Sequence, residues 1–236
     1  MKKAPSQNGS TTRLGACAVS ISCISFLRSL IKFNTSYKND FSPELKIDNV
    51  LLEVVKEMKL LGVIITSDLK WHQNTENITR KAYKRLWILK RLKQLGASTE
   101  ALTDIYAKHV RSVLEFAAVV WNSSLTQENI MTIERVQKSA FAVIIGSRYQ
   151  SYEEACVKLN METLIKRREK LSAKFATKSF KHKIHTKWFV PHTGETITRS
   201  EKPILNQVKG RTERLLKSAI PYLTNILNKK LSSVPL

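Results

Sequence analysis

Two kinds of hydrophobic pattern divide the chain. After residue 74, apolar residues recur every three or four positions, which predicts amphipathic helices. Before residue 72 they occur in short β-branched runs, which predict strands. We therefore expect an α+β chain that is mostly α. A small antiparallel hairpin or sheet at about 31–66 would precede an antiparallel helical bundle at about 74–146 and further basic helices.

The central apolar run, Leu60 to Ile65, predicts one buried or half-buried strand. Gly62 inside it suggests a β-bulge or a close approach by another backbone. Leu45 and Ile47, with the run 50–55, predict two further strands around the turn pair Asp48-Asn49. So small a sheet needs helices packed on it to be stable.

The first helix has Asn74 or Thr75 as its expected N-cap and Gly96 as its stop. Its apolar stripe comprises Ile78, Ala82, Leu86, Leu89, Leu92 and Leu95. Short connections between the helices of 74–146 predict a three-helix bundle. The later starts and stops are Ser98, Thr126, Gly146 and the capping box that opens at Ser151, followed by a helix at about 162–182.

We divide the chain into five parts. Residues 1–30 are expected to be a poorly structured lead segment, 31–71 a set of strands, and 72–146 the bundle. Basic helices fill 147–186, and 187–236 is expected to be a largely irregular tail with one ordered candidate at 220–228.

Charge changes this picture more than any other property. The chain has 40 Lys and Arg against 19 Asp and Glu, a net charge of +21. Nucleic acid is the usual partner of such a surplus, and an anionic membrane surface is the second candidate. The first helix concentrates the charge opposite its apolar stripe, because no acid follows Glu76 in it. Tyr83 and Trp87 share one face and would stack on bases or sugars, unless they belong to the core.

Catalytic chemistry is not apparent. The cysteines Cys17, Cys23 and Cys156 form no metal pattern, and the four aspartates are scattered, so no two-metal carboxylate site is predicted. The five histidines show no metal-ligand spacing, and no glycine-rich phosphate loop is present. We expect no enzyme, no metal and no cofactor.

The basic start and the apolar run Leu14 to Leu30 resemble a secretory signal, but serines and Arg28 interrupt the run. We interpret 1–30 as a lead segment that matches nothing else in the chain. An intracellular location, with the nucleus as one option, is expected rather than secretion, and no membrane span is expected.

From about Ile31 onward the chain resembles the C-terminal part of a reverse transcriptase from a non-LTR, LINE-type retrotransposon. The resemblance covers about 200 of the 236 residues. Its most specific motif is Lys59-Leu60-Leu61-Gly62-Val63 followed by Asp68-Leu69-Lys70-Trp71. Other matching pieces are Pro43 to Asp48, Lys84-Arg85-Leu86, Val110 to Glu115, Ile133 to Lys138, Arg167-Arg168 and Pro221 to Thr224.

The resemblance implies a role for each part. Residues 31–71 would be the C-terminal edge of the palm with the primer-grip hairpin, and 72–146 the thumb, which closes over a template–primer duplex. The family's metal-binding aspartates lie upstream of the primer grip, where 1–30 match nothing, so the implied function is a catalytically inactive remnant that binds RNA, DNA or their hybrid without sequence preference. Its expected nucleic-acid-binding residues are Lys59, Gly62, Arg80, Lys81, Tyr83, Lys84, Arg85, Lys90, Arg91, Lys93, Arg167 and Arg168.

Three alternatives remain open. The bundle is a protein-interaction module whose charge serves solubility, or the chain is an inert translated fragment that folds poorly and exposes Val63, Ile64 and Ile65 at a strand edge. The stretch also resembles sequences described as the N-terminal domain of an AlkB-type dioxygenase/methyltransferase. That chemistry needs an H-x-D iron triad or a glycine-rich strand–turn–helix, and the chain has neither.

Overall fold

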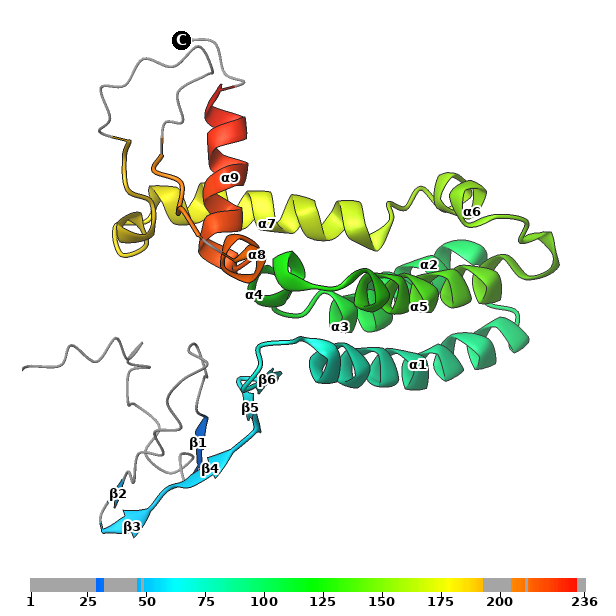
Figure 1. Cartoon of the computed structure of the whole chain (residues 1–236). Coiled ribbons are helices and arrows are strands. Elements are labelled where there is room, and N and C mark those ends of the chain that lie inside the picture. The colour runs from blue at the N-terminus through cyan, green and yellow to red at the C-terminus, as the bar shows by residue number, and fades with distance from the viewer. Residues whose placement is uncertain (1–28, 32–45, 48, 193–204, 211, 233–236) are drawn as a thin grey trace, which may run out of the picture.

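The structure is a computed structural model that describes residues 29–31, 46–47, 49–192, 205–210 and 212–232. Short strands lie before residue 67 and helices after residue 71 (Figure 1). The expected class, α+β and mostly α with a small hairpin ahead of the helices, is therefore confirmed. Nearly all of the predicted lead segment, and the breaker at Pro43, lie outside the described residues.

The strands pair two by two. In the described residues they are β1 Ser29–Ile31, β2 Lys46–Ile47, β3 Val50–Leu51, β4 Glu53–Val55, β5 Glu57–Leu60 and β6 Val63–Thr66. β2 and β3 are antiparallel, and Asn49 between them has a φ of 62°, as expected of a turn. β1 and β4 are parallel, which the antiparallel expectation missed. The stretch 32–52 between them is long enough for the crossover that a parallel pair needs.

The single strand predicted from Leu60 to Ile65 is wrong, because β5 and β6 form an antiparallel hairpin there. Leu61 and Gly62 make its two-residue turn, with φ of 46° and 90°. Positive φ at both central positions is the turn geometry that fits the twist of a hairpin. Leu61 is apolar and is not a usual turn residue, so the hydrophobic pattern ran through the turn without a sign of it.

The turn also contacts the bundle, which leads to a prediction for Gly62→Ala. A Cβ at position 62 would lie 3.1 Å from Cε1 of Phe116. Left-handed backbone strain and this contact together are expected to lower the free energy of unfolding by about 2–4 kcal/mol, measured by urea unfolding. Gly96→Ala is the control, since Gly96 has a φ of 82° with nothing within 4 Å of the added Cβ. Equal losses in the two variants would contradict a role for the Phe116 contact.

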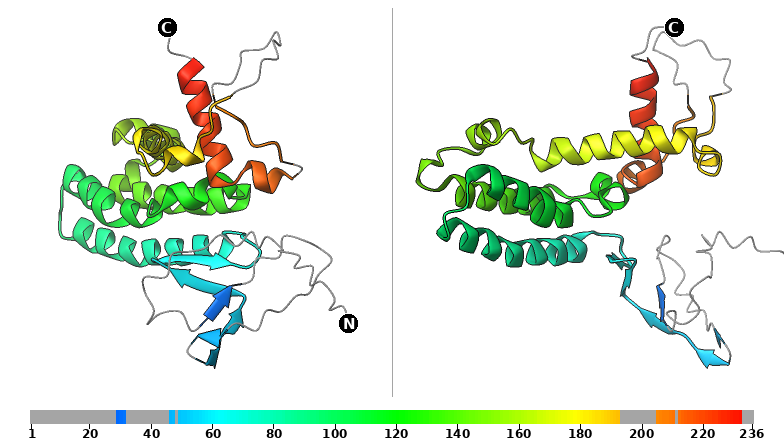
Figure 2. Two further views of the ribbon diagram at one scale, coloured as in Figure 1. Left: turned by 90° about the vertical axis from the view of Figure 1, so that its left-hand side faces the viewer. Right: turned by 180° about the vertical axis from the view of Figure 1, so that it is seen from behind.

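The helices stack in layers. In the described residues they are α1 His72–Gln94, α2 Thr99–Ile105, α3 Ser112–Leu114, α4 Ala118–Trp121, α5 Gln127–Ile145, α6 Tyr152–Lys158, α7 Leu164–Lys181, α8 Glu213–Leu216 and α9 Ala219–Ser232. α5 lies between α1 and α7 in all three views (Figures 1 and 2). Buried apolar residues of α1, α2, α5, α6 and the start of α7 form one core. That core continues to Leu164, beyond the bundle boundary expected at 146.

Most helix ends follow the local chemistry that the sequence predicts. Ser98, Thr126 and Ser151 each accept a hydrogen bond from the backbone amide three residues later. Gly96 and Gly146 follow α1 and α5 with φ of 82° and 72°. These caps satisfy backbone groups that helix ends leave without partners.

The start of α1 departs from its predicted cap. The helix begins at His72, and Asn74 and Thr75 are buried inside it. The Asn74 Oδ1 accepts a hydrogen bond from the Ile64 amide at 3.2 Å, so Asn74 fastens β6 to the helix rather than capping it. Val63 is buried against the core, and Ile64 and Ile65 are half-buried. The exposed strand edge expected for a poorly folding fragment is therefore wrong at these residues.

The helix predicted from Ser98 is interrupted twice. A π-helical segment, Tyr106–Arg111, joins α2 to α3. Ala117, with a φ of 52°, then separates α3 from α4. Tyr106 is fully buried, and its hydroxyl donates to Oε1 of Gln137 on α5 at 2.9 Å. The π segment thus begins at a side chain that ties α2 to α5.

The described part of the predicted irregular tail folds onto α7. Phe189, Leu205, Leu223 and Leu227 form a second core with Ala176 of α7. The Asn228 side chain accepts from the Leu205 amide at 2.8 Å and donates to the Leu205 carbonyl at 3.0 Å. The helix expected at 220–228 is present as the longer α9.

Candidate nucleic-acid interface

The outward face of α1 is a row of cations with one aromatic residue in it. Arg80, Lys84, Trp87 and Arg91 follow one another at spacings of four, three and four, which places them on one face of a helix. All four are exposed, while Ile78, Ala82, Leu86 and Leu89 are buried on the opposite side. At about 1.5 Å per residue the row is about 16 Å long. We call these four residues the α1 row.

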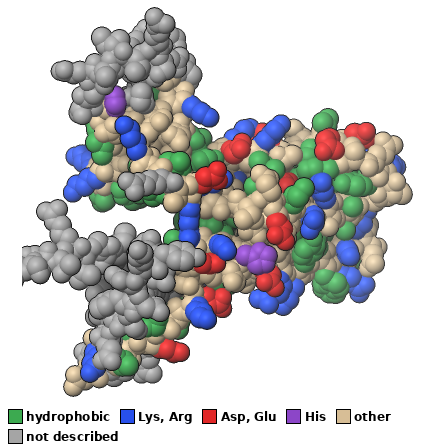
Figure 3. All heavy atoms as spheres, viewed as in Figure 1, with side chains coloured by type: hydrophobic (Ala, Val, Ile, Leu, Met, Phe, Trp, Pro, Cys, Tyr) green, Lys and Arg blue, Asp and Glu red, His purple; other side chains and the backbone are tan. Residues whose placement is uncertain are grey.

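Lys81, Tyr83 and Lys90 flank the α1 row and are also exposed. In Figure 3, Lys and Arg side chains lie with hydrophobic ones along the lower edge of the molecule, over α1. The helix carries no acid after Glu76. Like charges four apart, such as Arg80 and Lys84, destabilise a helix unless something neutralises them. The face is thus suited to a polyanion.

Two predicted site residues of α1 are used inside the protein instead. The Arg85 guanidinium donates to the His109 carbonyl in the π-helical segment. Lys93 donates from Nζ to the Ile144 carbonyl at 2.8 Å, and so caps the C-terminal end of α5. Both side chains are half-buried. They join the helices of the bundle rather than extend the α1 row.

Trp87 is the residue that the sequence left undecided, and it was not among the expected site residues. Its side chain is 64% exposed, so the core interpretation is wrong. The Arg91 guanidinium carbon lies 5.8 Å from the centroid of the Trp87 ring. Tyr83, one turn earlier, is 45% exposed. The four–three–four spacing with Arg80, Lys84 and Arg91 is the sequence signal that would have placed Trp87 outside.

Lys59 and Gly62 lie on the hairpin, near the N-terminal end of α1 (Figure 1). Lys59 is exposed on β5. Gly62 faces the ring of Phe116 closely, so the backbone approach that its sequence suggested is made within the chain. No hydrogen bond or ion pair among the described residues joins Lys59 to the α1 row.

Arg168 was expected at the interface, and this is wrong, because its side chain is fully buried between α7, α5 and the start of η2, Asn122–Ser124. Its Nε donates to Oδ1 of Asn122 at 2.9 Å, and its Nη2 lies 4.0 Å from Oε1 of Glu134. Burial lowers the pKa of the Arg168 guanidinium, and the charges of Glu134 and Glu115 oppose that shift. Arg167 is half-buried and forms an ion pair with Glu115. The start of α7 is thus an internal electrostatic joint.

The loop between β6 and α1 contains a second polar joint, at Asp68. Oδ1 of Asp68 accepts from the Thr66 hydroxyl at 2.6 Å and from the Lys70 amide at 3.0 Å. Partial burial raises the pKa of the Asp68 carboxyl, but these hydrogen bonds and the charges of Lys70 and Arg214 outweigh it, so the pKa lies below its ordinary value. Asp68 is ionised at neutral pH and organises the loop ahead of α1.

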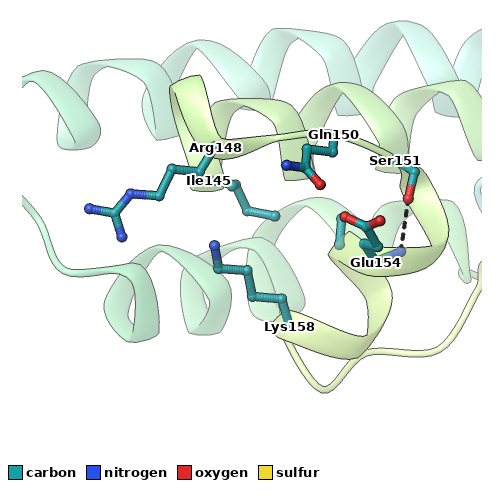
Figure 4. A pocket seen from close by; sticks show the side chains of 7 residues that line it. Ile145, Arg148, Gln150, Ser151, Glu154 and Lys158 are labelled. Carbon is teal, nitrogen blue, oxygen red and sulfur yellow. Dashed lines mark hydrogen bonds between the residues drawn. The ribbon is translucent and has the colours of Figure 1, made fainter.

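A separate hollow of about 350 Å³ lies between the end of α5 and α6 (Figure 4). Glu154 and Lys158 line it from α6 and Arg148 from the preceding turn, and the Ser151 cap bonds the Glu154 amide at 3.2 Å. None of the expected site residues lines it. Among the described residues, no group of three His, Cys, Asp or Glu side chains could hold a metal ion. No helix in the described part is long and apolar enough to span a membrane.

No protein-family model matches the chain, and no curated protein or solved structure matches it either.

Proposed function

We propose that the chain binds RNA, DNA or RNA–DNA hybrids without sequence preference through the exposed face of α1. The observation that carries the proposal is the uninterrupted run of cations on that face: Arg80, Lys81, Lys84, Lys90 and Arg91 are exposed, and no acid follows Glu76 in the helix. Contacts from such a face go to phosphates, which every nucleic-acid sequence presents. The net charge of +21 supports association with a polyanion in general.

The origin that we propose is the C-terminal part of a LINE-type reverse transcriptase. Its support is the order of the matching segments, above all Lys59 to Val63 followed by Asp68 to Trp71. A hairpin followed by a helical bundle is compatible with a primer grip and a thumb. The polymerase metals of that family need an aspartate pair, which these 236 residues do not contain. We therefore propose that the chain has no polymerase activity.

Fluorescence anisotropy of a labelled 12-base-pair RNA–DNA hybrid, titrated at several salt concentrations, tests the function. The expected result is binding that weakens steeply as salt rises, because bound cations release the counterions of the phosphates. Circular dichroism first confirms that the helices form. A folded protein that does not bind the hybrid even at about 50 mM salt would overturn the proposal.

A protein-interaction module is the second candidate, because an apolar surface lies beside the hairpin turn. Leu61 is 87% exposed, Phe116 51% and Val120 49%. Gly62 holds the turn against Phe116, so Leu61 and Phe116 belong to one region of the surface. This candidate predicts binding that does not depend on a polyanion, and it would remain if the hybrid did not bind.

A further inference from the structure

We infer that the α1 row binds unpaired nucleotides, with Trp87 stacking on a base, in preference to a closed duplex. This inference rests on the proposed function and names its substrate class. It starts from Trp87, which is 64% exposed at the centre of a cationic helix face. A single exposed tryptophan is ordinary by itself. Its place between Lys84 and Arg91 in one row, on a face without acids, is what gives it a ligand.

Phosphate and base recognition need different groups. Lys84 and Arg91 neutralise phosphates of any nucleic acid, whether single- or double-stranded. An indole ring offers a flat apolar surface on which every base can stack. In a duplex, each base already stacks on its neighbours inside the helix, so an external ring has no base face to bind. Trp87 therefore distinguishes the two forms where the cations do not.

The dimensions of the row fit a short single strand. From Arg80 to Arg91 it spans about 16 Å, which corresponds to about five stacked nucleotides at 3.4 Å each. Tyr83 lies four residues before Trp87, about 6 Å along the helix, and is 45% exposed. Arg91 covers part of the Trp87 ring, at 5.8 Å from the centroid, and still leaves 64% of the residue exposed. A base thus has access to the ring beside a cation that can reach its phosphate.

Trp87→Leu in the full chain tests this, because it removes the ring and leaves the charge unchanged. Labelled dT12 and a 12-base-pair RNA–DNA hybrid are titrated by anisotropy at one salt concentration and then at several. For dT12 the expected result is a loss of affinity of about tenfold, and for the hybrid a loss below about twofold. The dependence on salt should not change for either probe, since no cation has been removed. Trp emission on binding of dT12 should be quenched in the wild type and not in Trp87→Leu.

Trp188→Leu is the matched control, because Trp188 is 40% exposed and lies in the short 3₁₀ helix Thr186–Trp188, after α7. It should leave both affinities unchanged. Equal losses for dT12 and the hybrid in Trp87→Leu, or no loss for dT12, would overturn the inference while the proposed function stands. Failure of the wild type to bind either probe would overturn both. Unaltered helical content and urea midpoint in Trp87→Leu show that the fold is intact, as expected for an exposed side chain.

Discussion

Glu134→Ala is expected to lower the free energy of unfolding by about 3–5 kcal/mol, the largest stability effect that we predict. The Glu134 carboxylate accepts hydrogen bonds from the Ile165 amide, at 2.7 Å, and from the Tyr152 hydroxyl. It is also the acid beside Arg168, whose side chain is fully buried. Alanine would leave a buried cation without its counter-charge and two buried donors without acceptors. Urea unfolding followed by circular dichroism measures the loss.

A double variant separates charge from packing. Glu134→Leu with Arg168→Met removes both charges and keeps most of the volume, so it is expected to recover much of the stability lost in Glu134→Ala. Glu169→Ala, an exposed acid on α7, is the control and should change stability by less than about 0.5 kcal/mol. If the double variant were as unstable as Glu134→Ala, the cost would come from lost hydrogen bonds and packing rather than from the uncompensated charge.

Replacing Arg80, Lys84 and Arg91 together with alanine is expected to weaken binding of the RNA–DNA hybrid about 100-fold at 0.1 M salt. Each phosphate contact contributes about one unit to the slope of log affinity against log salt, so the slope should fall by about three units. Anisotropy titrations at four or five salt concentrations give both quantities. The variant should fold normally, because all three side chains are exposed. It should even be slightly more stable, since the repulsion between Arg80 and Lys84 is removed.

A control of equal net charge distinguishes a defined face from general basicity. Lys158, Lys209 and Lys229 are exposed on α6, on the segment before α8 and on α9, away from the α1 row. Their replacement with alanine changes the net charge by the same amount. If this variant lost as much affinity and slope as the α1 variant, binding would depend on total charge, and the assignment of the α1 face would be wrong.

The candidate site was only partly predictable, and Arg85, Lys93 and Arg168 show why. Each is a cation in a basic helix, as are Arg80 and Lys84, and nothing in its neighbours along the chain separates it from them. Their partners lie far away in sequence: the His109 carbonyl is 24 residues from Arg85, and Asn122 is 46 residues from Arg168. A cation becomes internal when the packing of two helices brings an acceptor to it. Periodicity within one helix contains no record of that event.

Trp87 and the hairpin turn show the same limit. An aromatic residue four positions from another is compatible with core or surface until the partners of the helix are known. The turn at Leu61-Gly62 lies in an apolar run because Gly62 contacts Phe116 of the bundle, so its setting is tertiary although its φ values are local.

What the sequence alone determined is local. Ser98, Thr126 and Ser151 as caps, Gly96 and Gly146 as stops, and the buried stripe of α1 all follow from hydrogen bonds and spacings within a few residues. The tertiary structure alone decided which cations are free to meet a ligand, where α9 packs, and that β1 pairs with β4 in parallel. The reason is physical: a helix or a cap is stabilised by its own neighbours, whereas burial and pairing depend on segments that only folding brings together.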